Sequence, residues 1–252
     1  MNEFLWVEKY RPKNIEHCIL PDDLKKTFKS FVDAGEVPNL LLCGTAGIGK
    51  TTVAKALCHE LGVDSIVING SDEGRFLDTV RNTAKQFAST VSLTSSAKHK
   101  VIIIDEADNT THDVQLLLRA SIEEFQRNCR FIFTCNFKNK IIQPLHSRTT
   151  VIDCNTRGKQ KQQIATQFFE RCRGILTAEN IEFTDAVVAE VVQKFFPDFR
   201  RTLNELQRYA ASGVIDTGIL AQISQIRLEK LVGALKGKDF GSSREWMVAK
   251  HD

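Results

Sequence analysis

Residues 44–51 have the sequence Gly-Thr-Ala-Gly-Ile-Gly-Lys-Thr, and this stretch decides how the rest of the chain is interpreted. It follows the apolar run Leu40–Cys43 and precedes a helical pattern that starts at Thr52. A Gly-x-x-x-x-Gly-Lys-Thr segment between a strand and a helix is typical of a phosphate-binding loop. Its glycines let consecutive N–H groups turn toward phosphate oxygens, and the helix start adds unpaired N–H groups. The segment therefore predicts a nucleoside triphosphate site.

Two side chains of this loop carry specific chemistry. Lys50 is expected to contact the β- and γ-phosphates, and the Thr51 hydroxyl is expected to bind Mg²⁺, which prefers oxygen ligands. An ordinary Gly-rich turn with a surface lysine is the alternative, and the position between a strand and a helix argues against it. The remaining predicted ATP-binding residues of the loop are Gly44, Gly47, Ile48, Gly49 and Thr52.

Composition narrows the class of protein. The chain has 252 residues, of which 42% are hydrophobic and 26% charged, as in ordinary globular proteins. A net charge of +3 is too small to identify a partner. The seven cysteines show no Cys-x-x-Cys spacing, which argues against a zinc site and favours a reducing compartment. Without a leader pattern or a long apolar stretch, we expect a cytoplasmic protein with no membrane partner.

Alternating strand and helix patterns predict the fold class. Helical periods separate five strand-like runs, so the sequence predicts an α/β fold with a five-stranded parallel sheet. After about residue 155 the strand signals disappear and helical patterns follow, which predicts a small all-α lid domain. The predicted strand-like runs are Leu40–Cys43, Ser65–Asn69, Val101–Ile104, Phe131–Thr134 and Thr150–Asp153. The predicted domains are residues 1–154, 155–216 and 217–252.

Polar side chains follow two of these strands. Asp105 and Glu106 come after four β-branched residues, and Asn136 follows the strand at 131–134. Ligands of open α/β sheets bind beyond the carboxyl ends of the strands. Asp105 is therefore expected to hold Mg²⁺, Glu106 to orient the attacking water, and Asn136 to contact the γ-phosphate or that water. The alternatives are acids that end a strand or cap the next helix, and an asparagine that forms a turn.

Several motifs occur in one order along the chain. The most specific motif is Trp-Val-Glu-Lys-Tyr-Arg-Pro at 6–12. The others are the phosphate loop, Asn-Gly-Ser-Asp-Glu at 69–73, Ile-Asp-Glu-Ala-Asp at 104–108, Asn136 and Ser147-Arg148. In this order the motifs resemble the ATPase subunits of sliding-clamp loaders, the replication factor C small-subunit type of the AAA+ superfamily. The likeness covers about residues 5–215, and residues 197–202 look most like the large subunit of the clamp loader of large tailed bacteriophages.

The resemblance implies further ATP contacts. In the family, the arm around Tyr-Arg-Pro shapes the adenine pocket, although it can equally pack as a plain N-terminal arm. The implied residues are Val7, Glu8, Lys9, Tyr10, Arg11 and Ile19. An arginine of the lid reaches the phosphates, and helical geometry leaves both Arg200 and Arg201 open, whereas the resemblance selects Arg200.

Other implied roles concern neighbouring molecules. Arg148 is expected to act in trans on a neighbouring subunit's γ-phosphate, although Thr149 replaces the family's cysteine. Asn69 is expected to restrain Glu106 as a switch. Basic residues of one predicted helix are expected to track the DNA backbone, with solvated surface charges as the alternative. These residues are Arg75, Arg81 and Lys85.

The function that the resemblance implies is a DNA-dependent ATPase within a clamp loader. ATP binding would open the clamp and grip primer–template DNA, and hydrolysis would release the closed clamp. The implied partners are the other clamp-loader subunits in a pentamer with a small subunit, the sliding clamp and DNA, in the host cytoplasm if a phage encodes the chain. Residues 217–252 would begin a truncated or reduced helical collar. A helicase or branch-migration motor and a non-catalytic assembly module are the alternatives.

Overall fold

A computed structural model describes residues 4–71, 85–89, 99–156, 158–211 and 213–215. Its centre is a five-stranded sheet with the order β2-β3-β4-β1-β5, in which all neighbouring strands are parallel. This arrangement confirms the predicted fold class. The strands are β1 (Leu40–Cys43), β2 (Ser65–Asn69), β3 (Lys100–Asp105), β4 (Cys129–Cys135) and β5 (Thr150–Asp153).

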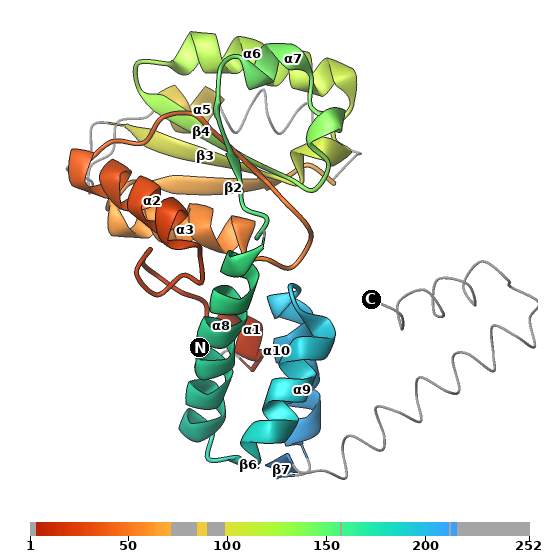
Figure 1. Ribbon diagram of the computed structural model, residues 1–252. Coiled ribbons are helices and arrows are strands. Elements are labelled where there is room, and N and C mark those ends of the chain that lie inside the picture. Colours follow the sequence, from red (N-terminus) through yellow and green to blue (C-terminus); the bar gives the residue numbers. More distant parts are fainter. Residues whose placement is uncertain (1–3, 72–84, 90–98, 157, 212, 216–252) are drawn as a thin grey trace, which may run out of the picture.

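Helices cover both faces of this sheet (Figure 1). On one face lie α2 (Asp22–Ala34) and α3 (Lys50–Glu60). On the other lie α5 (Lys85–Ser89), α6 (His112–Phe125) and α7 (Gln143–His146). Two short 3₁₀ turns, η2 (Ala107–Asn109) and η3 (Lys138–Lys140), follow β3 and β4.

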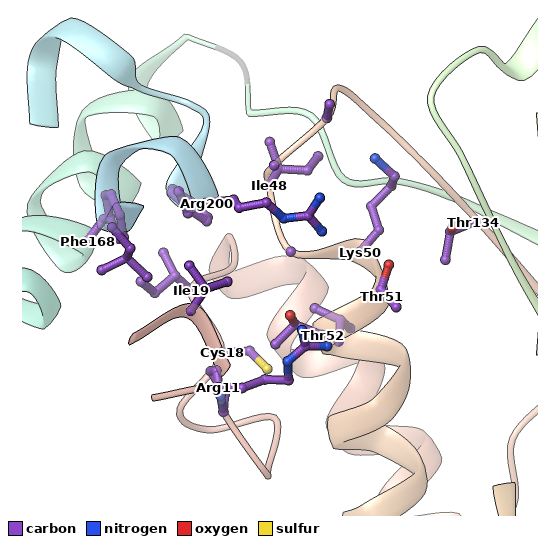
Figure 2. Close-up of a pocket in the computed structure, with 18 of the residues that line it drawn as sticks. Arg11, Cys18, Ile19, Ile48, Lys50, Thr51, Thr52, Thr134, Phe168 and Arg200 are labelled. Atoms are coloured by element: carbon purple, nitrogen blue, oxygen red, sulfur yellow. The ribbon is translucent and has the colours of Figure 1, made fainter. Parts of the chain in front are cut away.

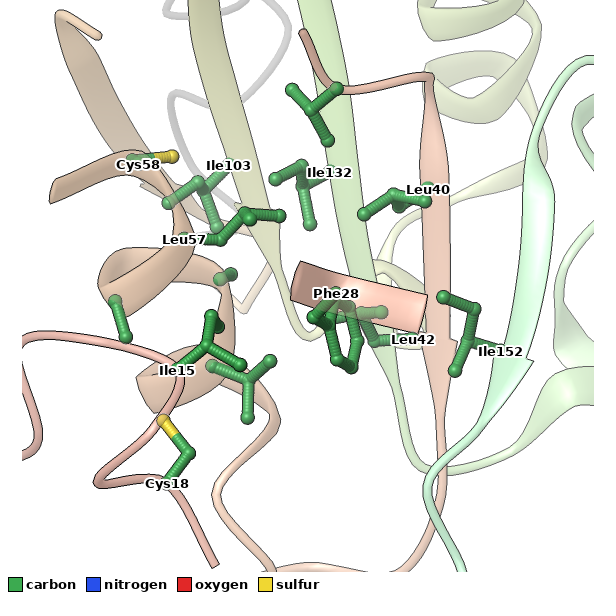
Figure 3. Packing of buried hydrophobic residues seen from close by; sticks show 14 of the residues in the cluster. Ile15, Cys18, Phe28, Leu40, Leu42, Leu57, Cys58, Ile103, Ile132 and Ile152 are labelled. Carbon is green, nitrogen blue, oxygen red and sulfur yellow. The ribbon is translucent and has the colours of Figure 1, made fainter. Parts of the chain in front are cut away.

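Strand β1 is apolar throughout because both of its faces are covered. Leu40 and Leu42 point toward α2 and α3, whereas Leu41 and Cys43 point to the opposite face, and all four are buried. A strand covered on both faces needs an unbroken apolar run, because side chains alternate between faces. Figure 3 shows Phe28 and Leu57 packed against the first of these faces.

The lid follows the sheet as three helices, α8 (Lys159–Ala178), α9 (Asp185–Phe195) and α10 (Phe199–Ala210). One prediction needs correction here, because the sequence indicated no strands after about residue 155. The structure pairs β6 (Glu182–Phe183) with β7 (Val214–Ile215) in parallel. Each strand has only two residues, too few to produce a detectable alternation. The proposed collar segment, 217–252, lies outside the described residues.

The N-terminal arm packs against this lid. Helix α1 (Trp6–Lys9) inserts the buried Trp6 among the lid's apolar side chains. The Gln207 side chain joins the two segments, since it accepts from the Trp6 N–H at 3.0 Å and donates to the Phe4 carbonyl at 2.7 Å. The lid core thus contains residues from both ends of the described chain. None of the helices in the described ranges has the length and apolarity to cross a bilayer.

All seven cysteines are buried free thiols. Burial raises the pKa of Cys58, Cys154 and Cys172 to about 12, from 9.0 for a free thiol. An unfolded chain would ionise these thiols above pH 9, whereas the folded chain keeps them protonated. Ionisation therefore favours the unfolded state in alkaline solution.

We predict that the free energy of unfolding decreases as the pH rises from 9 toward 12. The contribution of Cys154 is fully present below the unfolded pKa and is lost as the pH rises through the folded pKa. Replacing Cys154 with Ala should make this decrease shallower by up to about 1.4 kcal/mol per pH unit, measured by urea unfolding at several pH values. The control Val151→Ala, on β5 directly before Cys154, should lower stability without changing the slope, and equal slopes in all three proteins would contradict the prediction.

Candidate nucleotide site

A cleft lies where the carboxyl edge of the sheet, the N-terminal arm and the lid meet (Figure 2). Most of the sequence-predicted ATP and metal residues line it. They are Val7, Tyr10, Arg11, Ile19, Gly47, Ile48, Gly49, Lys50, Thr51, Thr52, Asp105, Glu106, Asn136 and Arg200. The parallel sheet explains this convergence, because β1, β3 and β4 all end at the same edge.

The phosphate loop connects β1 to α3 with left-handed backbone at two of its glycines, Gly47 (φ 78°) and Gly49 (φ 92°). A side chain at Gly47 would overlap the Asp198 carboxylate, so glycine lets the lid approach the loop. The Phe199 N–H donates to the Gly47 carbonyl at 3.1 Å. The loop is therefore a contact point between the sheet and the first residues of α10.

Lys50 is buried beneath the loop. Its Nζ donates to the carbonyls of Gly44 and Thr45 and to Asn136 Oδ1, each at 2.8 Å. Gly44 thus contacts the lysine through its backbone, although it does not line the cleft. Burial lowers the pKa of Lys50, and nearby Cys154, Cys135, Asp105 and Asp108 act in the opposite direction. Anionic oxygens in the cleft would favour the charged lysine.

Asp105 brings two hydroxyl groups together. Thr51 Oγ1 and Thr134 Oγ1 each donate to Asp105 Oδ1 at 2.6 Å. The carboxylate and the Thr51 hydroxyl are hard oxygen donors, so this donor set fits Mg²⁺. Thr134 also accepts from the Glu106 N–H at 3.0 Å. Thr134 was not predicted as a site residue from the sequence. The signal that could have identified it is a hydroxyl side chain within the apolar strand β4.

Glu106 has a left-handed backbone (φ 55°), which is uncommon for a residue other than glycine. The Ser71 hydroxyl donates to Glu106 Oε2, and Asn109 Nδ2 donates to the same oxygen at 3.1 Å. Asn69, the predicted switch, instead accepts from the Ser71 N–H at 3.1 Å. Asn69 is therefore connected to Glu106 through Ser71. The chain turns at Gly70, and this turn brings the Ser71 hydroxyl to the glutamate.

The N-terminal arm closes one side of the cleft. Lys9 Nζ and Tyr10 OH both donate to Glu179 Oε1 of the lid at 2.6 Å, and these contacts lower the pKa of Glu179. Arg171 donates to the Tyr10 carbonyl at 2.8 Å. Lys9 and Glu8 do not line the cleft, and Glu8 pairs with Arg11. The arm thus presents Val7, Tyr10 and Arg11 and uses Lys9 to hold the lid.

The lid supplies a further wall and one arginine. Arg200 lines the cleft, whereas the Arg201 guanidinium lies 4.8 Å from the ring centroid of Phe195. Geometry thus resolves which arginine faces the cleft. Sequence reasoning missed several lining residues, because helical periodicity marks an apolar face without showing which residues border a cleft. They are Cys18, Phe168, Arg171, Ile175, Phe199 and Leu203.

Arg148 lies outside the cleft, after α7. Its Nε and Nη2 atoms donate to Glu123 Oε1 of α6 at 2.8 and 2.6 Å, and Nη1 donates to the Pro144 carbonyl at 3.0 Å. The guanidinium lowers the pKa of Glu123. Arg148 is therefore held away from the cleft of its own chain.

Of the three residues predicted to contact DNA, one lies within the described residues. Lys85 is exposed on α5, whereas Arg75 and Arg81 lie outside the described residues.

Comparison with known proteins identifies the family and the fold of the chain. Residues 40–155 match the model of the ATPase family associated with various cellular activities (AAA), and residues 160–221 match the sliding-clamp-loader large subunit, AAA+ ATPase lid domain. The RuvB Holliday junction branch migration motor of Thermotoga maritima superposes with a TM-score of 0.67 at 22% identity, covering 86% of this chain and 72% of that one. That likeness shows the fold alone. Fold and site together define a nucleotide-binding AAA+ ATPase.

Curated relatives narrow the class further. The sliding-clamp-loader large subunit of Escherichia phage RB69 is 41% identical over 248 residues, which cover 96% of this chain and 76% of the relative. The replication factor C small subunit of Thermofilum pendens is 35% identical, with 94% and 74% covered. The chain belongs to the sliding-clamp-loader large-subunit family. The resemblance found in the sequence is thereby confirmed.

The Thr134 hydroxyl gives a direct test of the site's internal hydrogen bonds. Thr134→Val keeps the side-chain volume but removes the donor to Asp105 and the acceptor for the Glu106 N–H. We expect the free energy of unfolding to fall by about 1–3 kcal/mol, because buried polar groups lose their partners. Denaturant unfolding measures this change. The exposed Thr166→Val on α8 should stay within about 0.5 kcal/mol of the wild type, and equal effects of the two changes would refute the assignment.

Proposed function

We propose that this chain is the ATPase subunit of a DNA-polymerase sliding-clamp loader. ATP binding opens the clamp and grips primer–template DNA, and hydrolysis releases the closed clamp onto DNA. One observation carries the proposal: Lys50, Asp105, Glu106, Asn136 and Arg200 surround one cleft, while Arg148 lies outside it on the same chain. Such a division suits a site completed by a neighbouring subunit.

Nucleotide binding would exchange hydrogen-bond partners at Lys50. Its ammonium group is satisfied by two carbonyls and Asn136, and the triphosphate oxygens would replace some of these neutral acceptors with charged ones. Val7, Tyr10 and Ile19 would border the adenine, and Arg200 would bring α10 toward the phosphates. ATP in the cleft would thereby connect the arm, the loop and the lid.

Hydrolysis would depend on Glu106. Bound Mg²⁺, held by Thr51 and Asp105, would neutralise phosphate charge. Glu106 would orient the attacking water and polarise its O–H bond, and Asn136 would hydrogen-bond that water or the γ-phosphate. Ser71 and Asn109 occupy Glu106 Oε2, so the glutamate has to leave or share these donors to act.

Arg148 would act on the next subunit. An arginine supplied in trans stabilises charge on the transferred phosphoryl group. In this chain Glu123 holds the guanidinium through two of its nitrogens, at 2.8 and 2.6 Å. Assembly would place Arg148 against a neighbour's ATP and make turnover dependent on the complex.

The proposed partners are other clamp-loader subunits in a pentamer with a small subunit, the sliding clamp and primer–template DNA. Lys85, together with Arg75 and Arg81, would contact the DNA backbone and give salt-sensitive, sequence-independent affinity. The proposed domain division is 1–154 for the ATPase, 155–216 for the lid and 217–252 for a collar segment. ATPase activity should therefore require DNA, clamp and partner subunits together.

A helicase or branch-migration motor is the weaker alternative. The lid at 160–221 matches a clamp-loader lid model, and the described residues after 155 form helices with one pair of two-residue strands rather than a second nucleotide-binding sheet. Processive strand separation by this chain in a translocation assay would favour the alternative.

Two substitutions separate binding from hydrolysis. Glu106→Gln should lower DNA- and clamp-stimulated ATP turnover by about a hundredfold or more, because the general base is lost while nucleotide still binds. Lys50→Ala should weaken binding of a fluorescent ATP analogue by about tenfold or more, since a charged hydrogen bond to phosphate is lost. Steady-state turnover and equilibrium titration measure the two effects.

Exposed residues provide matched controls for these two substitutions. Glu124→Gln on α6 and Lys26→Ala on α2 should leave both quantities unchanged. If Glu106→Gln retained full stimulated turnover in a complex whose other subunits were inactive, Glu106 would not be the catalytic residue.

Mixing two inactive variants tests the action in trans. Arg148→Ala keeps its own cleft intact, whereas Glu106→Gln keeps an intact arginine. Each alone should turn over ATP about a hundredfold more slowly than wild type. A mixed assembly should regain activity, because an intact cleft then meets an intact Arg148. A mixture no more active than its components would show that Arg148 does not act across an interface.

A further inference from the structure

Asp108 connects the two polar strand ends of the cleft. It lies in η2, directly after Glu106 and Ala107, and only 5% of its surface is exposed. Its Oδ2 accepts from the Asn136 N–H at 3.1 Å and from the Phe137 N–H at 2.9 Å. Asp108 does not cap the helix that follows, because Thr111 accepts from the Val114 N–H at the start of α6.

The contact fixes the backbone from which Asn136 extends. A buried carboxyl group is costly unless it is hydrogen-bonded, and two N–H donors on one oxygen define its geometry closely. Asn136 in turn accepts from Lys50 Nζ at 2.8 Å. A chain of contacts thus runs from η2 through Asn136 to the lysine of the phosphate loop.

The same turn also reaches the catalytic glutamate proposed above. Asn109 Nδ2, one residue after Asp108, donates to Glu106 Oε2 at 3.1 Å. The two neighbouring side chains of η2 therefore hold different parts of the site, Asp108 the end of β4 and Asn109 the glutamate after β3. A displacement of Asn136 would be transmitted to the turn that holds Glu106.

We propose that Asp108 is a positioning residue for ATP hydrolysis, which sets Asn136 relative to Lys50 and links it through η2 to Glu106. This inference rests on the proposed function of Glu106 and Asn136. Asp108 itself touches neither the phosphates nor the attacking water. Its loss should therefore change turnover more than nucleotide affinity.

The first test compares Asp108→Ala with Asp113→Ala, an exposed acid of α6, in the complex with partner subunits, clamp and primed DNA. We expect kcat to fall about tenfold or more in Asp108→Ala, because a small misplacement of a reacting group is costly. The affinity for a fluorescent ATP analogue should change by less than about threefold, since Lys50 keeps its loop contacts. Asp108→Asn, which keeps an oxygen acceptor, should recover part of the turnover. If Asp108→Ala does not fold, Asp108→Asn replaces it in the comparison with Asp113→Ala, and its kcat should lie below that of the control.

A double-mutant cycle separates positioning from plain stabilisation. If Asp108 acts through Asn136, adding an Asp108 substitution to Asn136→Ala should lower kcat by less than about twofold further. Losses that multiply, or an Asp108 variant as active as Asp113→Ala, would overturn the inference. If Asn136→Ala and Glu106→Gln both kept the wild-type kcat, the proposed site would be wrong as well. If these two variants lost activity while the Asp108 variants kept it, only the role of Asp108 would be wrong.

Discussion

The site depends on the parallel pairing of β4 with β1 on one side and β3 on the other. This pairing places Cys43 opposite Cys135 and brings β3 to the same edge, so three chain segments leave the sheet side by side. Asp105 is the last residue of β3, and the phosphate loop, Glu106 and Asn136 directly follow the three strands. A shift of one residue in either register would move a polar group away from the others and turn core side chains to the wrong face.

Two polar groups of the cleft, Lys50 and Asp105, are already paired within the chain. Lys50 has three acceptors, and Asp105 has two hydroxyl donors. Pairing of this kind is expected, because buried polar groups without partners are costly. Ligand binding is consequently an exchange of partners, and its net free energy is smaller than the sum of the new contacts. The lid takes part in this exchange, since its Phe199 N–H is bonded to Gly47 of the loop.

The sequence was sufficient to predict the five strands of the main sheet, the loop and the residues at the strand ends, because local pattern and parallel topology determine them. It did not show that Ser71, rather than Asn69, contacts Glu106, since that depends on a turn and on the left-handed backbone at Glu106. Thr134 was not predicted for a similar reason, because its partners, Asp105 and Glu106, lie at the end of β3, distant in the sequence. The packing of Trp6 in the lid is a contact between distant segments that no local period records.

That packing has a consequence for how the chain folds during synthesis. The Trp6 N–H bonds to Gln207, 201 residues later, so the arm is synthesised long before its partner in the lid. The sheet can close from residues before 154, whereas the arm must wait until α10 has emerged. Until then an apolar indole stays without its native cover, and the wall that the arm adds to the cleft is incomplete. The cleft is therefore completed late, when the two ends of the described chain meet.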